Sequence, residues 1–259
     1  AQPITVRRHL LDLESPDRLR SVHPVVDLVT FLPLVTALVA GVFCVQVFRR
    51  WASRPSAHLL LWGIGLVFYS GAALMQAVHG LSGWDPLVFR LWYLGGAILV
   101  AAWLGQGTVH LLTPRPVAWG LLAILVAASG YAAFKVFAAD LDPALLPGSG
   151  LTADPGPLSG EAITSPGVRA LTPFFNVYGV LWLAGGAIWS AMTFFRRGTH
   201  RNRAIGNLLI AAGALGAAGG GTLQRLFSTP VALSIGNLLG ALLLFAGFLV
   251  ATRPDRRSE

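Results

Sequence analysis

The sequence has few charged residues and almost no lysine or cysteine. Charged residues make up 12% of the 259 positions, about half of the roughly 25% that a soluble domain carries. Hydrophobic residues make up 54%. A chain with so few polar side chains cannot cover a water-exposed surface, so the composition excludes a soluble domain and indicates a membrane protein.

Several kinds of chemistry are excluded by what the sequence lacks. Cys44 is the only cysteine, so the chain can form neither an intrachain disulfide nor a cysteine cluster for zinc or iron–sulfur. The sequence contains no HExxH zinc motif, no phosphate-binding loop and no serine-nucleophile motif. We therefore expect a protein that is not an enzyme and that holds no metal.

Seven apolar runs follow one another along the chain. About 20 apolar residues is the length that crosses a bilayer as a helix. The breaks between runs carry arginines, as at Arg49 and Arg50, or prolines, as at Pro114 and Pro116, which cannot continue a helix. The predicted spans are 25–48, 57–80, 87–112, 116–139, 171–195, 204–227 and 230–252.

The basic residues predict an orientation in the membrane. They lie in short clusters between the spans, which argues against a nucleic-acid partner in spite of the net charge of +8. The connections and tail on one side carry eleven basic residues against two acids. The other side, with the span ends that lie there, holds the remaining eight basic residues against nine acids. Because cytoplasmic segments are rich in Arg and Lys, we expect a multi-pass cell-membrane protein with its N-terminus outside and its C-terminus in the cytoplasm.

Three segments are predicted in this layout. Residues 1–24 form an exterior tail with a short amphipathic helix, whose start is marked by Ser15 and Pro16. Residues 25–252 form the transmembrane domain, which includes an exterior loop rich in Pro, Gly and Ser at 140–170. Residues 253–259 form a cytoplasmic tail. The predicted fold is an all-α membrane protein, a seven-transmembrane helical bundle in the lipid bilayer.

Polar side chains gather at the ends of the spans that are expected to face outward. Gln76 and His79 lie three residues apart on one face of the second span. Arg225 is a natural anchor for an anion, and His79 is a proton-sensitive partner. The predicted ligand-binding residues are Gln76, His79, Asp85, Tyr93, Asn176, Gln224, Arg225 and Asn237. In a compact ring of helices they would form an outward-facing pocket. The alternative is that residues at this depth are interfacial anchors and that Arg225 pairs with Asp85 or with acids of the loop.

No cofactor is predicted, and two alternatives remain open. His58 and His110 lie at one depth on neighbouring spans, an arrangement that can ligate a haem, although a histidine at the water boundary needs no ligand. The fifth span carries an aromatic stripe with Tyr178, Trp182 and Trp189. Such a stripe usually packs in a core or against lipid, and it can also line the site of a flat apolar pigment or quinone.

Glycines are frequent in the last two spans. Gly216 and Gly220 form a GxxxG pair, as do Gly236 and Gly240. Such pairs predict close helix packing. The run of three glycines at 219–221 has a second interpretation, a local unwinding of the helix that exposes backbone groups to a cavity.

Three classes of function remain. A binding or sensing protein would hold a small ligand in the outward pocket and act through a separate protein partner, because the cytoplasmic connections are too short for an effector. An accessory subunit of a larger membrane complex would present an extended apolar face. A transporter would be a parallel repeat of the first three and last three spans, a repeat suggested by the Phe-Arg-Arg runs that begin at Phe48 and Phe195. Sparse polarity at mid-membrane argues against the transporter, and we favour the first class.

Overall fold

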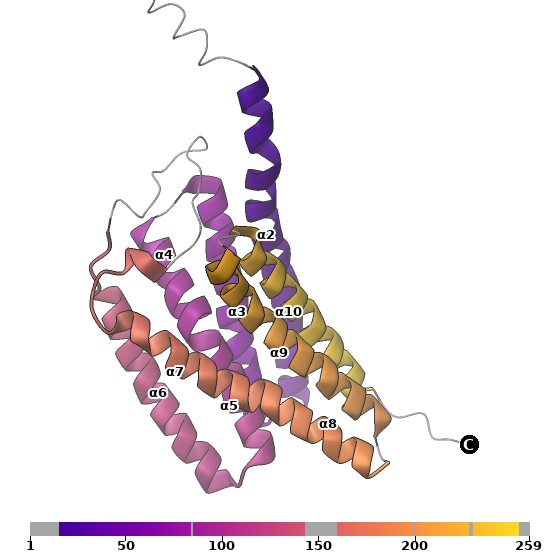
Figure 1. The fold of residues 1–259 in the computed structure, drawn as a ribbon. Coiled ribbons are helices and arrows are strands. Elements are labelled where there is room, and N and C mark those ends of the chain that lie inside the picture. The colour runs from indigo at the N-terminus through magenta and orange to yellow at the C-terminus, as the bar shows by residue number, and fades with distance from the viewer. Residues whose placement is uncertain (1–15, 84, 143–159, 199, 228–229, 254–259) are drawn as a thin grey trace, which may run out of the picture.

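A computed structural model of the chain is built almost entirely of helices (Figure 1). It describes residues 16–83, 85–142, 160–198, 200–227 and 230–253, with the backbone alone over 16–29 and 224–227 and at 230. Seven helical stretches in it are long and apolar enough to cross a membrane. The predicted all-α, seven-transmembrane class is therefore confirmed. The predicted tails 1–24 and 253–259 and the centre of the loop at 140–170 lie largely outside the described residues.

Five spans are single helices and two are built from three segments each. The single helices are α2 (Pro16–Ser53), α3 (Ala57–Ser82), α6 (Arg115–Phe137), α9 (Arg201–Phe227) and α10 (Pro230–Ala251). The third span consists of α4 (Pro86–Trp92), the π-helical segment η1 (Tyr93–Leu99) and α5 (Val100–Leu112). The fifth span consists of α7 (Val168–Val180), the π-helical segment η4 (Leu181–Gly185) and α8 (Gly186–Arg196).

The helix that begins at Pro16 does not stop before the first span. It continues without a break to Ser53, and its apolar, membrane-crossing part begins at Thr30. In Figure 1 the first turns of α2 extend beyond the other helices. The helix start expected at Pro16 and the first span therefore belong to one element.

The six spans other than α6 form a closed ring. We call the end of the bundle near Ser53, Arg115 and Arg196 the arginine end, and the end near Ser82 and Val168 the loop end. Around the ring, α2 packs on α3, α3 on the third span, the third span on the fifth, the fifth on α9, α9 on α10, and α10 on α2. The α6 helix lies outside this ring against the third and fifth spans, as Figure 1 shows at the edge of the bundle.

Glycines set the close packing of α9 on α10. A Cβ added to Gly220 would lie 2.9 Å from the Cα of Gly236, and one added to Gly206 would lie 2.6 Å from the carbonyl oxygen of Gly247. Contacts this short between backbones are possible only where both helices lack side chains. The α9 helix also runs unbroken through residues 219–221. Gly206, Gly220, Gly236 and Gly247 therefore serve close packing, and the alternative of local unwinding is wrong.

A short antiparallel bridge closes the base of the loop at 140–170. Leu141 pairs with Ile163, and the amide of Asp142 donates to the carbonyl oxygen of Ala162 at 2.9 Å. Arg90 of α4 donates from Nη2 to the carbonyl oxygen of Ala139 at 3.0 Å. These bonds hold the loop-end terminus of α6 against the third span.

Candidate functional site

The strongest polar feature inside the ring is a pair of hydrogen bonds from α3 to α10. Gln76 donates from Nε2 to the hydroxyl of Ser234 at 2.9 Å, and Tyr69 donates its hydroxyl to the backbone carbonyl of Asn237 at 2.7 Å. Gln76 and Ser234 are 3% and 1% exposed. Tyr69 and Gln76 lie seven residues apart, so two turns of α3 present both side chains to one face. We call Tyr69, Gln76, Ser234 and Asn237 the α3–α10 seam.

The seam spans a gap between two helices that touch little elsewhere. Both α3 and α10 pack extensively on α2, whereas their own backbones come close at few points. The long side chains of Tyr69 and Gln76 bridge the distance. Gly240 makes room for one of them, because a Cβ there would lie 3.1 Å from the Tyr69 hydroxyl. The link between α3 and α10 therefore depends on polar side chains more than on apolar packing.

His79 lies in the bundle one turn beyond Gln76 toward the loop end. It is 1% exposed, so it faces protein rather than lipid. The next residue, Gly80, packs on α2, where an added Cβ would meet the Thr30 hydroxyl at 2.2 Å. Gln76 and His79 thus both point inward, as the expected pocket requires. Buried polar groups at such a depth are costly and often functional.

Tyr93 and Asn176 form a second group, between the third and fifth spans. The Tyr93 hydroxyl lies 2.9 Å from the hydroxyl of Thr172, and Asn176 donates from Nδ2 to the carbonyl oxygen of Ala97 at 3.0 Å. Ala97 lies in η1, and the widened turns of a π-helix disturb the regular backbone hydrogen bonds. Asn176 provides a donor at that place. The structure therefore divides the predicted pocket residues between two helix pairs.

Asp85 has a local role at the surface. Its side chain is exposed and accepts hydrogen bonds from the amides of Leu87 at 2.7 Å and Val88 at 3.2 Å, which makes it the N-cap of α4. The Asp-Pro pair at 85–86 is a sequence signature of such a cap. Gln224 and Arg225 lie where the backbone alone is described. Their place in a site, including the role of Arg225 as an anion anchor, stays a prediction.

A polar cluster nearer the arginine end was not foreseen as a unit. Gln106 of α5 is fully buried, donates to the carbonyl oxygen of Ala118 in α6 at 2.9 Å, and accepts from the hydroxyl of Tyr178 in α7. His110 lies one turn further on, with Nδ1 at 3.0 Å from the Gln106 carbonyl oxygen. Gln106 therefore ties three helices together. The i, i+4 spacing of Gln106 and His110 was visible in the sequence, but the contact with Tyr178 depends on how the helices cross.

The two histidines considered for haem have tryptophan neighbours. His58 lies edge-on to Trp62 with the ring centres 5.4 Å apart, and His110 lies edge-on to Trp119 at the same distance. Within the described residues, no group of three or more His, Cys, Asp or Glu side chains is arranged to hold a metal ion. In the aromatic stripe considered for a pigment or quinone, Trp189 is 68% exposed on the outside of the ring.

Below the seam, toward the arginine end, the interior of the ring is apolar. Leu66, Leu104, Leu183 and Leu244 are buried there in one cluster to which all six ring spans contribute. Within the ring, the polar contacts of the seam thus lie from mid-membrane toward the loop end, while the Gln106 cluster lies between the third span, α6 and α7. Comparison with protein-family models, with curated proteins and with solved structures finds no match.

Proposed function

We propose that this protein binds a small polar ligand at the α3–α10 seam, entering from the loop end, and acts through a separate membrane partner. The observation that carries the proposal is the buried Gln76–Ser234 hydrogen bond between two helices that otherwise touch little. An intramembrane polar residue is a candidate for function because its burial is costly. The apolar cluster below the seam favours access from one side only.

The chemistry of the seam fits recognition rather than catalysis. The Gln76 amide offers a donor and an acceptor, and the Ser234 hydroxyl offers both roles in one group. In the closed state these groups bond to each other. A ligand with a carboxylate, amide or hydroxyl group replaces that bond with two of its own and separates α3 from α10. Since α9 and α10 are joined by glycine contacts, the two helices would move together and carry the signal to the partner.

Cysteine labelling tests the access route. In a Cys44→Ala background, which removes the only cysteine, Ser234→Cys should react with a charged, membrane-impermeant thiol reagent applied from the exterior. The matched control is Leu244→Cys, on the same helix but within the apolar cluster, which should stay unlabelled in the membrane. Equal protection of both cysteines, in proteins that melt at the same temperature, would exclude a seam that opens to water.

A ligand screen tests binding itself. We expect one class among small carboxylates, phosphates, amides and sugars to raise the melting temperature of the purified protein, and Gln76→Leu to abolish that rise. The control is Asn207→Leu, because Asn207 donates to Ser190 at 2.9 Å and so makes a similar bond between α9 and α8. A ligand response lost equally in both variants would show that general destabilisation, rather than the seam, is responsible.

A second candidate function, an accessory subunit of a larger membrane complex, is favoured by the position of α6. This helix lies outside the ring, and only 17% of its apolar, membrane-crossing stretch is buried. Its outer face exposes Ile124 and Phe134 at 67% and 69%. A photo-crosslinker at position 124 in living cells should then give one discrete adduct. A crosslinker at Leu38 of α2, which is 63% exposed, serves as the control for random encounters.

A further inference from the structure

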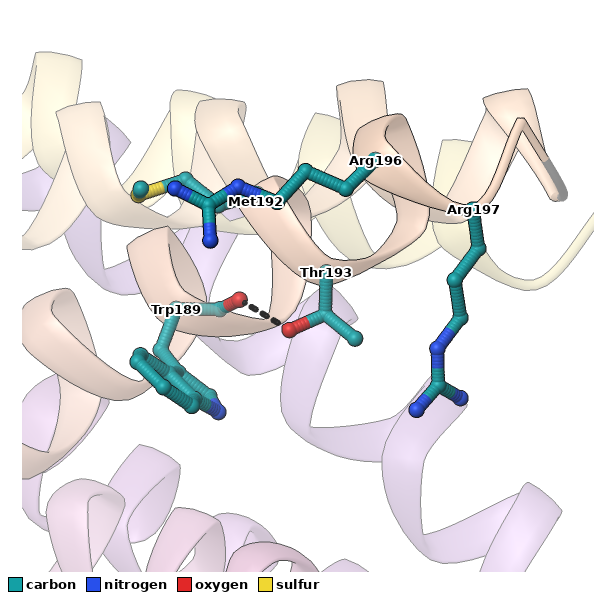
Figure 2. A pocket seen from close by; sticks show the side chains of 5 residues that line it. All are labelled: Trp189, Met192, Thr193, Arg196 and Arg197. Carbon is teal, nitrogen blue, oxygen red and sulfur yellow. Dashed lines mark hydrogen bonds between the residues drawn. The ribbon is translucent and has the colours of Figure 1, made fainter.

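We infer that the membrane-facing side of α8 at the arginine end binds the headgroup and upper acyl chain of an anionic phospholipid. A hollow of about 190 Å³ lies there, lined by Trp189, Met192, Thr193, Arg196 and Arg197. Figure 2 shows the Trp189 ring and the Arg197 side chain extending to the same side of the helix, while Arg196 lies back toward Met192. We call this feature the α8 groove.

The groove combines two chemistries at the depths where a phospholipid has them. Trp189 and Met192 are 68% and 44% exposed and lie within the apolar part of the fifth span. Arg196 and Arg197 lie at the end of that span, where headgroups are found. Tryptophan is enriched at this boundary because its ring is apolar and its N–H is polar. A soluble anion would need only the arginines, whereas a lipid uses both halves of the groove.

The arginines of the groove have no acid in their part of the chain. No Asp or Glu occurs between Glu161 and Asp255, although Arg196, Arg197, Arg201 and Arg203 all fall in that stretch. The Thr193 hydroxyl already donates to the Trp189 carbonyl oxygen at 2.9 Å, as the dashed line in Figure 2 marks. Arg196 and Arg197 are therefore the cationic donors that line the groove, and Arg binds phosphate through paired N–H groups. Charge complementarity selects an anionic headgroup over a zwitterionic one.

Native mass spectrometry of the full chain in detergent tests the site. We expect phosphatidylglycerol to be retained more tightly than phosphatidylcholine of the same acyl composition. The double variant Arg196→Gln/Arg197→Gln should weaken phosphatidylglycerol binding by about tenfold to thirtyfold. This is the sum for two arginines, each with the usual attraction of an arginine to an anionic surface. The matched control Arg201→Gln/Arg203→Gln removes the same charge from the start of the neighbouring helix and should leave the preference nearly intact.

The apolar half of the groove is tested separately. Trp189→Ala should weaken the binding of both lipids. Phe195→Ala changes an exposed aromatic residue on another face of α8 and should leave the binding of both lipids unchanged. Equal loss in the two arginine double variants would overturn the inference in favour of a diffuse positive surface. Displacement of the bound lipid by inorganic phosphate alone would also overturn it, because the groove would then be a site for a free anion.

Discussion

The side-chain amide of Gln76 and the hydroxyl of Ser234, 2.9 Å apart, join the second span to the seventh. Hydrogen bonds between membrane helices contribute about 0.6 kcal/mol on average and up to about 1.7. We expect Gln76→Leu and Ser234→Ala each to lower the free energy of unfolding by about 1 kcal/mol, because each leaves a buried partner unsatisfied. Unfolding titrations in mixed micelles measure the change.

The double variant shows whether the two residues act on each other. We expect Gln76→Leu/Ser234→Ala to lose less than the sum of the two single variants, by about 0.5–1.5 kcal/mol. Strictly additive losses would mean that the bond contributes nothing and that the seam is held by its other contacts. The cycle can be measured without knowledge of any ligand.

The third and fifth spans cross where Gly105 meets Gly179. A Cβ added to Gly179 would lie 2.3 Å from the carbonyl carbon of Ala101. The two backbones could relieve this clash only if the helices moved apart. We expect Gly179→Ala to cost about 3 kcal/mol or more, measured as a lower melting temperature. The control is Gly185→Ala on the same span, where nothing lies within 4 Å of an added Cβ. A similar loss for both variants would place the close approach elsewhere.

The glycine contacts of α9 and α10 can be separated by substitution. A Cβ on Gly236 would lie 2.6 Å from the Cα of Gly220, whereas one on Gly216 meets nothing within 4 Å. We therefore expect Gly236→Ala to destabilise the protein by about 1–3 kcal/mol and Gly216→Ala to be nearly neutral. Thermal unfolding of the two variants compares them directly. Equal effects would mean that the approach of Gly236 to Gly220 does not determine the outcome.

The bond from Asn176 to Ala97 predicts a local effect on the π-helical segment η1. Asn176→Leu removes the donor at 3.0 Å from that carbonyl oxygen. We expect faster amide hydrogen exchange over Tyr93–Leu99, because a partly buried carbonyl without a partner favours local opening. Amide hydrogen exchange in η4, in the fifth span that carries Asn176, should stay unchanged. A uniform increase across both spans would indicate global destabilisation instead.

The orientation of the chain is also open to direct measurement. A reporter that is active only in the cytoplasm should be active when fused after Glu259 and inactive when inserted in the loop at 140–170. The reason is the excess of eleven basic residues over two acids on the side of the C-terminus. Exchanging Arg49, Arg50 and Arg54 for glutamine should weaken this preference. The reverse pattern of reporter activity would invert every statement about access to the seam.

Part of the site was predictable and part was not. Gln76 and His79 were placed on one inward face by their spacing, and both are buried in the bundle. Asp85 was expected in the ligand site, and its role as the N-cap of α4 was not foreseen, although Pro86 follows it directly. The partner of Gln76 could not be predicted, because Ser234 lies 158 residues away on another helix. The rotation of that helix about its axis is set by its own packing contacts. Asn237 contributes its backbone carbonyl to the seam, which no side-chain pattern indicates.

The sequence by itself determined the membrane class, the seven spans and the breaks between them, because bilayer thickness and the cost of burying charge act on short stretches of chain. Only the tertiary structure decided which polar groups meet. Rotation of each helix about its axis is set by contacts such as Gly105 on Gly179 and Gly220 on Gly236. A small change of rotation moves a side chain from lipid to the interior, and the composition of a span does not indicate that rotation. For that reason the pocket expected as one ring of residues is divided between the α3–α10 seam and the pair formed by the third and fifth spans.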